Sequence, residues 1–314
     1  MNTGSIEVSR LGYLGAALLL VVGSACGPAE GAFELEAGDE TGELAEELRG
    51  ANGLSLNGLS LNGLSLNGLS LNGLSLEGLS SAEFDTWFQE NPELHNQVMK
   101  YVVRCAVPAG VTRTYTSAST GMTRTWKGNL GLAPDWTNGA PATVAEQQIV
   151  SACLAAHADK YGVHTRISVL GRGATGEAIP YTSEELQRFS EREACFFGNL
   201  FTDEGVFVGN DGRPLNNRES TTRACALSSR RNDDNQECLP IVRVERDCAR
   251  FCTLDASRKF YVSCTYNGVE YPVITTRLRP ADIYTCGDDV CQLTESCGTG
   301  HTPDNCGVDC GRCQ

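Results

Sequence analysis

The sequence predicts an α+β fold: a disulfide-rich globular domain with helices and short antiparallel strands, preceded by a low-complexity stalk and followed by a small cysteine-rich module. Fifteen cysteines are spread through 314 residues, which is typical of exported proteins with oxidised sulfur. Residues 143–161 carry apolar side chains at helical spacing, and residues 163–169 alternate as a strand does. A five-residue repeat precedes this region, and six cysteines crowd the last 29 residues.

Residues 1–25 are predicted to be a signal peptide. Arg10 precedes the apolar run LGYLGAALLLVV, which is too short for a permanent membrane helix and is followed by small residues. The segment VVGSAC resembles a bacterial lipobox, in which the chain is cut before a cysteine that is then acylated. That resemblance implies lipidation of Cys26, while ordinary cleavage after Ala25 is the alternative. We expect an exported protein, lipid-anchored at the bacterial outer membrane or cell surface.

The number of cysteines agrees with lipidation. Without Cys26 fourteen remain, eight in the central domain and six in the tail, so each block can pair internally. Cys248 and Cys252 lie one helical turn apart and are expected to bridge to different partners. The predicted disulfide cysteines are Cys105, Cys153, Cys195, Cys225, Cys238, Cys248, Cys252, Cys264, Cys286, Cys291, Cys297, Cys306, Cys310 and Cys313.

Residues 26–50 are predicted to be an acidic linker. Eight acidic side chains stand against Arg49 in this segment, and few residues are apolar, so it cannot bury a core. The net charge of the chain is −14, and much of it lies in this linker and in the tail. Acidic flanks argue against nucleic acid as a partner.

Residues 51–80 form an internal repeat, in which NGLSL occurs five times before a final EGLS. The period resembles that of pentapeptide-repeat proteins, whose square β-helix places a central Leu inside each face. Such a helix needs several stacked units to bury a core, and too few are present here. An extended or loosely turned stalk is therefore favoured. A short coil docked on the core and a partner-binding strip are the alternatives.

The folded domain is expected over residues 81–285, beginning near Ala82. Phe84, Trp87 and Phe88 predict one apolar helix face, and Asn91-Pro92 predicts the start of a second helix, with a capping Asn and a Pro in the first turn. The Thr-rich runs VTRTYTS and MTRTWKG then predict a β-hairpin within residues 111–140.

The central helix is the element best specified by the sequence. Thr143 and Glu146 have the spacing of a capping box, which fixes the start of the helix, and Gly162 is expected to end it. Residues 163–169 should follow as a half-buried strand.

A second capping box, Thr182 with Glu185, predicts a helix through about Ala194, and EACFFGNLF should enter the core. Residues 209–240 are polar and are expected to be a disulfide-tied loop region. Asn267-Gly268 then predicts a hairpin between strands at residues 259–266 and 269–278.

Residues 286–314 are too few to bury a core and must be held by crosslinks. The segment CGDDVCQLTESCGTGHTPDNCGVDCGRCQ resembles the small CGDGVC-type modules at the ends of secreted bacterial proteins. The whole layout resembles a group of cysteine-rich lipoproteins of myxobacterial type, a resemblance that brings no known activity. The tail also contains weak calcium-ligand candidates, namely Asp288, Asp289, Glu295, Asp304 and Asp309.

Two motifs suggest specific chemistry, and the sequence argues against both. GRGATG, residues 171–176, fits a dinucleotide pattern, but residues 177–180 do not begin a helix that could hold a phosphate. We therefore expect a glycine loop and no nucleotide. Cys153 and His157, with His164 nearby, could form a zinc site or a thiol nucleophile. The even number of cysteines favours a disulfide and an exposed histidine instead.

No catalytic residue, resident metal or cofactor is predicted, and no GxSxG, HExxH or P-loop sequence occurs. We expect a binding or structural role, with the membrane reached through the N-terminal lipid and with a protein or glycan as the possible ligand. A secreted hydrolase using His157, Glu184 or Glu185 is the alternative. An aromatic ligand platform is conceivable, although burial in the hairpin is favoured; its residues would be Tyr115, Trp126 and Trp136.

Overall fold

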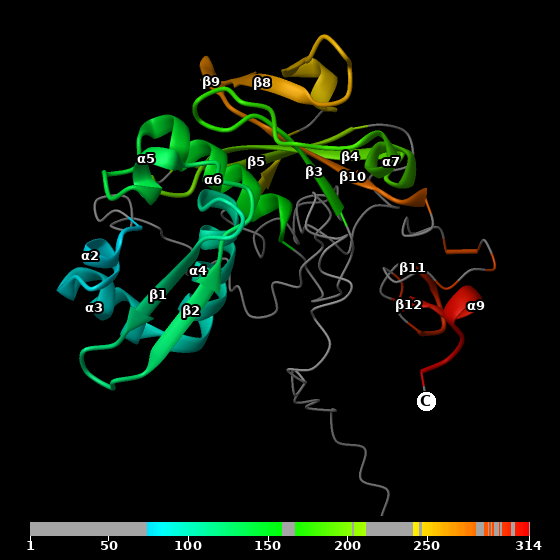
Figure 1. The fold of residues 1–314 in the computed structure, drawn as a ribbon. Helices are drawn as coiled ribbons and strands as arrows, with labels where there is room; N and C mark the ends of the chain where they lie inside the picture. The colour runs from blue at the N-terminus through cyan, green and yellow to red at the C-terminus, as the bar shows by residue number, and fades with distance from the viewer. Residues whose placement is uncertain are drawn as a thin grey trace, which may run out of the picture. The chain divides into compact units, whose positions relative to one another are not determined.

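The computed structural model describes residues 74–158, 167–202, 204–211, 241–244 and 247–280 of the domain. In the tail it describes residues 286–287, 289, 291, 295, 297–302 and 305–313. All of these belong to one unit, Thr41–Gln314. The predicted signal peptide, the acidic linker and most of the repeat lie outside the described residues. Helices and mainly antiparallel strands confirm the α+β class (Figure 1).

The first helices are α2 (Leu76–Leu79), α3 (Ala82–Glu90) and α4 (Pro92–Ala106). Ser81 caps α3 by accepting a hydrogen bond from the Phe84 backbone, at 3.2 Å. Asn91 caps α4 by accepting one from the Leu94 backbone, at 3.3 Å, with Pro in the first turn. The predicted start of the second helix is therefore confirmed, and the first helix is present where its apolar face predicted it.

A hairpin of β1 (Thr112–Thr116) and β2 (Thr123–Lys127) packs beside these helices, as the Thr-rich runs predicted. Its inward aromatic residues meet the apolar face of α3. The Tyr115 ring lies 5.0 Å from the ring of Phe84 and 4.7 Å from that of Phe88, measured between centroids. The hairpin is thus fixed by aromatic burial on one face.

The short helix α5 (Pro134–Thr137) leads to α6 (Val144–Ala156), the predicted central helix. Both hydrogen bonds of the Thr143 and Glu146 capping box are present. The helix ends at Ala156, earlier than predicted. His157 shares its backbone N–H among the last carbonyls, and its Nδ1 lies 2.8 Å from the Cys153 carbonyl, so the final turn tightens and stops. Gly162 lies outside the described residues.

A five-stranded sheet, in the order β3-β10-β4-β5-β6, forms the middle of the domain. Neighbouring strands are antiparallel except β5 and β6, which are parallel. Helix α6 covers one face, and a three-stranded sheet, β7-β8-β9, covers the other (Figure 1). The strands are β3 (Ile167–Gly171), β4 (Glu191–Asn199), β5 (Gly205–Asn210), β6 (Ile241–Arg243), β7 (Cys252–Leu254), β8 (Tyr261–Tyr266), β9 (Val269–Tyr271) and β10 (Ile274–Leu278).

Two predicted elements differ in the structure. The half-buried strand was expected over residues 163–169, of which 163–166 lie outside the described residues. The rest begins β3, where every residue is buried, and Glu185 of helix α7 (Ser183–Arg188) covers the otherwise outward Ser168. The helix expected to reach Ala194 ends at Arg188. The chain then enters β4, where it is buried between α6 and the small sheet, an environment that favours its aromatic residues as a strand. EACFFGNLF does enter the core, as predicted.

The Asn267-Gly268 turn is confirmed, since both residues have positive φ, 50° and 80°. Two positive φ values match the type I′ turn that the dipeptide predicts. The strand expected over residues 269–278 is interrupted at Pro272, which lacks the N–H that a sheet interior requires. Its first part, β9, pairs with β8, and its second part, β10, becomes a central strand of the large sheet.

In the described part of the chain, six disulfides are present. Three lie in the domain, Cys105–Cys153, Cys195–Cys248 and Cys252–Cys264, and three in the tail, Cys286–Cys306, Cys291–Cys310 and Cys297–Cys313. Cys248, in the 3-10 helix η4 (Cys248–Arg250), and Cys252 bridge to different partners, as expected. Cys225 and Cys238 lie outside the described residues.

The tail contains three short elements around its disulfides. They are β11 (His301–Thr302), β12 (Asn305–Cys306) and α9 (Gly307–Cys310). Among the residues described, no helix has the length and apolar character that crossing a bilayer requires.

Candidate functional site

The end of the pentapeptide repeat packs into the core of the domain and is held there by backbone hydrogen bonds. Leu74 and Leu79 are buried in the main core, with 1% and 2% of their surface exposed. The Leu74 backbone N–H donates to the Trp136 carbonyl at 2.9 Å, and Arg113 Nε donates to the Leu74 carbonyl at 2.5 Å. Both backbone groups and the side chain of one repeat residue are therefore engaged. We call Arg113, Trp136, Thr137 and Gly139 the repeat-docking site.

Arg113 organises this site from strand β1. Its guanidinium donates from Nη2 to the Thr137 carbonyl at 2.9 Å and from Nη1 to the Thr112 carbonyl at 2.9 Å, besides the bond to Leu74. Burial lowers the pKa of Arg113. One cation thus joins the hairpin, helix α5 and the repeat by hydrogen bonds to three carbonyls.

Helix α5 and the turn after it supply the other residues of the repeat-docking site. Trp136 is fully buried, and its ring meets that of Phe201 edge-on, at 5.4 Å between centroids. Gly139 has φ of +98°, and a Cβ placed there would lie 3.2 Å from the Cβ of Ser75. A side chain at residue 139 would therefore strain the turn and press on the repeat.

The repeat adopts a single helical turn here. The Ser75 hydroxyl accepts from the Gly78 N–H at 3.2 Å, and its carbonyl accepts from the Leu79 N–H at 3.0 Å. Leu thus supplies burial and Ser supplies the cap. Residues 74–79 form neither the stalk expected there nor a β-helix coil, and the domain begins before the boundary expected at residue 81.

Cys153, considered as a thiol nucleophile or zinc ligand, forms a disulfide instead. Cys153 is bonded to Cys105, so its sulfur is neither a nucleophile nor a metal ligand. His157, expected to be exposed, is buried with 1% of its surface accessible. Its Nδ1 contacts the Cys153 carbonyl, and its ring lies 5.8 Å from that of Tyr101. These contacts explain the burial. His164 lies outside the described residues.

The aromatic residues considered as a ligand platform are buried, so they present no exposed surface. Tyr115, Trp126 and Trp136 are 2%, 4% and 0% exposed. The Tyr115 hydroxyl donates to Asp85 at 2.5 Å, and Trp126 Nε1 donates to Asn96 at 2.9 Å. The favoured interpretation, burial in the hairpin, holds for Tyr115 and Trp126.

The two carboxylates of the hydrolase alternative have different surroundings. Glu184 is exposed, whereas Glu185 is buried and accepts a hydrogen bond from the Ser168 hydroxyl at 2.6 Å. Burial raises the pKa of Glu185, although the bond from Ser168 opposes it. Glu185 and His157 contact different groups, and no arrangement of converging catalytic side chains includes them in the part of the chain described.

The raised pKa of Glu185 predicts a pH-dependent stability. A carboxyl whose folded pKa lies above its ordinary value of 4.5 stabilises the fold most below that value, and this contribution is lost as the pH rises through the folded pKa. We therefore expect Glu185→Gln to become more stable relative to the unsubstituted protein between pH 4 and pH 7. Urea unfolding across this range measures the difference. Glu184→Gln, at an exposed position, is the matched control and should show no such trend; parallel curves for both variants would refute the prediction.

A buried charge cluster not expected from the sequence joins the two sheets. Arg192 Nε lies 3.1 Å from Asp211, and the Tyr261 hydroxyl donates to the other Asp211 oxygen at 3.1 Å. Burial raises the pKa of Asp211, while Arg192 opposes the shift. Arg277 Nε donates to the Phe189 carbonyl at 2.7 Å. These residues come from distant segments, so no local spacing could reveal the cluster.

The calcium candidates of the tail are only partly described. Asp309 accepts hydrogen bonds from the backbone N–H groups of Gly287, at 2.5 Å, and Asp289, at 3.1 Å. Both of its oxygens therefore hold the loop. Calcium requires six or more oxygen ligands, and Asp309 is already engaged by N–H donors. Glu295 is buried beside the disulfide sulfurs. Asp288 and Asp304 lie outside the described residues.

The GRGATG segment folds into a closed turn. The Gly173 N–H donates to the Glu177 carbonyl at 2.8 Å, and Arg172 pairs with Ala178 in a β-bridge. The next helix, α7, begins only at Ser183. A phosphate-binding loop requires a helix whose amino terminus directly follows the glycines, and α7 does not begin there.

The comparisons with known proteins add no family. No family model matches the chain, and neither the curated proteins nor the solved structures contain a significant match.

Proposed function

We propose that this protein is an exported lipoprotein that displays a disulfide-tied domain at the bacterial outer membrane or cell surface, in a binding or structural role. The observation that supports it best is the docking of Leu74 and Leu79 into the domain core. The segment that leads from the lipidation candidate Cys26 ends inside the domain, rather than in a loose linker. Six disulfides among the described residues suit an oxidising compartment.

The proposed anchor places the domain at a distance that the sequence bounds. Residues 26–73 separate the acylated residue from the docked Leu74. At full extension this segment reaches at most roughly 160 Å. The acidic side chains of residues 27–50 repel one another and anionic lipid, which favours separation of the domain from the membrane surface. A protein or a glycan outside the cell is the proposed class of ligand.

Replacement of the lipidation residue tests the anchor. Cys26→Ala should abolish acylation and release the protein from the membrane fraction, because no other residue of the cleavage site can carry the thioether-linked lipid. Mass spectrometry of the mature amino terminus and detergent phase partitioning of the full chain measure both effects. Ser24→Ala, inside the same cleavage region, is the control and should keep the lipid. An unmodified Cys26 in the mature protein would overturn the anchor, and protection of the domain from protease on intact cells would overturn surface display.

A further inference from the structure

The docked segment is nearly identical to four segments that precede it. Residues 73–80 are GLSLEGLS, and residues 68–75 are GLSLNGLS. The windows beginning at residues 53, 58 and 63 have that same sequence. The only difference is Glu77, which is Asn in every upstream window. The chain therefore carries five versions of one ligand and, within the described residues, a site that holds one of them.

We propose that the repeat-docking site accepts the upstream repeats in place of residues 74–79, so that the tether can shift its register in steps of five residues. After one step, Leu69 fills the place of Leu74, and Leu74 fills the place of Leu79. The proposed occupant is the repeat of the same chain, residues 54–76.

Each recognised feature of the docked segment recurs upstream. The site buries two Leu side chains five residues apart, and a Ser follows the first Leu and caps the turn. Further contacts use backbone groups: Trp136 and Arg113 bind the backbone of the first Leu, and the Gly78 carbonyl accepts from the Ser81 N–H at 3.2 Å. Backbone contacts do not distinguish one repeat from another. The single differing position, residue 77, is polar in both forms, and the two buried Leu positions are Leu in every register.

The cost of a shifted register is small beside the cost of an empty site. A shift by one repeat inserts five residues between the docked turn and Ser81, which caps α3. Loop-closure entropy grows only with the logarithm of loop length, whereas an empty site exposes two buried Leu positions. The observed register needs no inserted loop and should be preferred. The shifted registers become occupied when a substitution disrupts the observed register or when force is applied to the tether.

Register exchange would make the tether adjustable. Each step moves five residues from the free tether into the loop before α3, which shortens the reach of the tether by roughly 17 Å at full extension. This property does not depend on the lipid anchor. It can be tested on the exported full chain, with Cys26 replaced or retained, and a failure would leave the proposed function untouched.

The decisive test is an energetic coupling between Leu69 and Leu79. Leu79→Asp places a carboxylate at one of the two buried Leu positions of the observed register. A shift by one repeat puts Leu69 and Leu74 at these two positions and so restores an apolar residue to each. We expect Leu69→Asp alone to leave the melting temperature unchanged and Leu79→Asp alone to lower it modestly. The double variant should lose more than Leu79→Asp alone, because the Leu69→Asp change places a carboxylate in the site in the first two shifted registers and leaves only the third and fourth, which insert longer loops. Additive effects would overturn the proposal.

Deletion of the upstream repeats gives an independent test. A chain lacking residues 52–71 should melt at the same temperature as the full chain, yet Leu79→Asp in it should cause a loss at least as large as that of the double variant, because no shifted register remains. If that variant does not fold, Leu79→Ala supplies a milder form of the same comparison. Equal losses from Leu79→Asp with and without the upstream repeats would contradict the exchange. Rescue that depends on protein concentration, with a dimer in size-exclusion chromatography, would show docking from a second copy and refute the intrachain form.

Discussion

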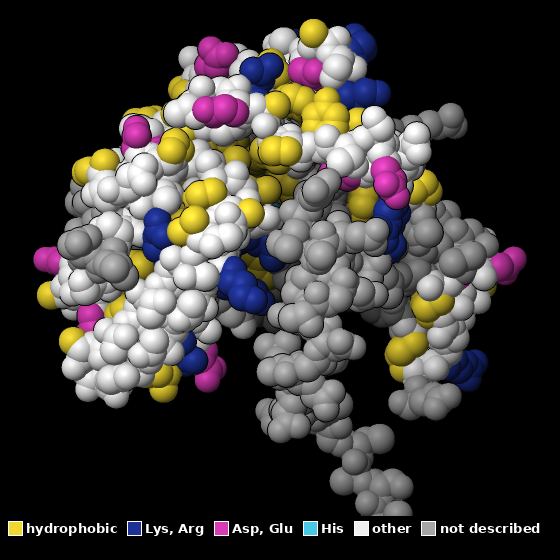
Figure 2. Space-filling view, viewed as in Figure 1, with side chains coloured by type: hydrophobic (Ala, Val, Ile, Leu, Met, Phe, Trp, Pro, Cys, Tyr) yellow, Lys and Arg dark blue, Asp and Glu magenta, His cyan; other side chains and the backbone are white. Residues whose placement is uncertain are grey.

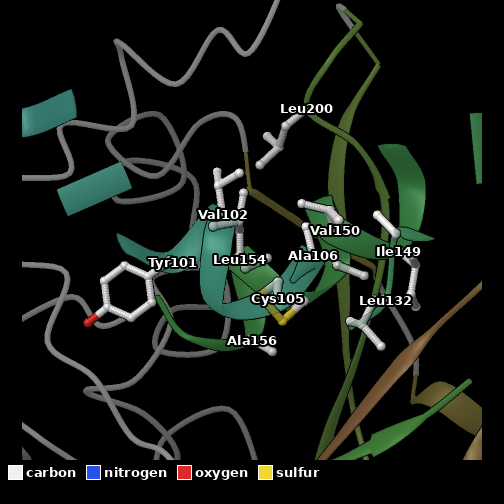
Figure 3. Packing of buried hydrophobic residues seen from close by; sticks show 14 of the residues in the cluster. Tyr101, Val102, Cys105, Ala106, Leu132, Ile149, Val150, Leu154, Ala156 and Leu200 are labelled. Atoms are coloured by element: carbon white, nitrogen blue, oxygen red, sulfur yellow. A yellow bond between two sulfur atoms is a disulfide. The ribbon is translucent and has the colours of Figure 1, made fainter. Parts of the chain in front are cut away.

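Replacement of both Cys105 and Cys153 by alanine is expected to lower the free energy of unfolding by about 4 kcal/mol. Their disulfide closes a loop with a sequence separation of 48 residues and ties helix α4 to helix α6. Both cysteines are completely buried. Figure 3 shows Cys105 among apolar side chains that the two helices contribute. Without the bond, the unfolded chain gains the freedom that the loop had removed. The loss of two buried sulfurs adds to this effect.

Guanidinium unfolding of the exported full chain measures the change, and a second disulfide provides the comparison. Cys252–Cys264 has a sequence separation of only 12, and Cys252 is half-buried, so the double alanine variant at these positions should lose about 3 kcal/mol. The loss at Cys105 and Cys153 should be the larger. A larger loss at Cys252 and Cys264 would contradict the account by loop length and burial.

The elements that were predicted correctly carry their signals within a few residues. Thr143 with Glu146, Ser81 and Asn91 each cap a helix through a neighbour three residues away, and Asn267-Gly268 sets its own turn. Periodicity and capping express local physics, so a single sequence contains them. The end of a helix is less certain, as the early stop at His157 shows.

Strand order depends on contacts that no local pattern records. Strand β10 inserts between β3 and β4, so the segment that follows Pro272 enters the middle of a sheet formed by much earlier segments. This insertion helps to explain why every residue of β3 and residues 193–199 of β4 are buried. Alternation predicts one solvent-exposed face, but here both faces are covered. Helix α6 covers one, and the small sheet with Glu185 of α7 covers the other.

Local sequence patterns do not predict the repeat-docking site either. Arg113 lies 39 residues after the Leu74 carbonyl that it contacts, and the five NGLSL copies are identical in sequence. The one available signal was the departure of the last copy, EGLS, directly before the capping Ser81. The space-filling view shows apolar side chains in scattered small groups on the visible face, with acidic and basic residues between them (Figure 2).

Glu146→Ala is expected to lower the free energy of unfolding by about 4 kcal/mol, because this one carboxylate satisfies two chain segments. One oxygen accepts from the backbone N–H groups of Asp135, at 2.7 Å, and Trp136, at 3.2 Å. The other accepts from the Thr143 N–H at 2.9 Å and its hydroxyl at 3.1 Å. Glu146 is 1% exposed, so water cannot replace these bonds without opening the structure.

Two controls separate the hydrogen bonds of Glu146 from its charge and its volume. Glu146→Gln keeps the shape but offers one acceptor oxygen instead of two, and should lose roughly half as much as alanine. Glu184→Ala, also in the first turn of a helix but exposed, should change stability by less than about 0.5 kcal/mol. Equal losses for Gln and Ala would show that charge, not acceptor number, is what the site requires.

The Glu146 substitution should also reach the repeat, because the same carboxylate holds the start of helix α5. The Trp136 carbonyl that accepts from Leu74 belongs to this helix, so loosening its first turn weakens the docking contact. Amide hydrogen exchange at residues 74–79 should therefore quicken in Glu146→Ala well before global unfolding. Exchange at Leu74 that stays as slow as in the unsubstituted protein, while α5 exchanges faster, would show that Arg113 and Leu burial alone hold the repeat in place.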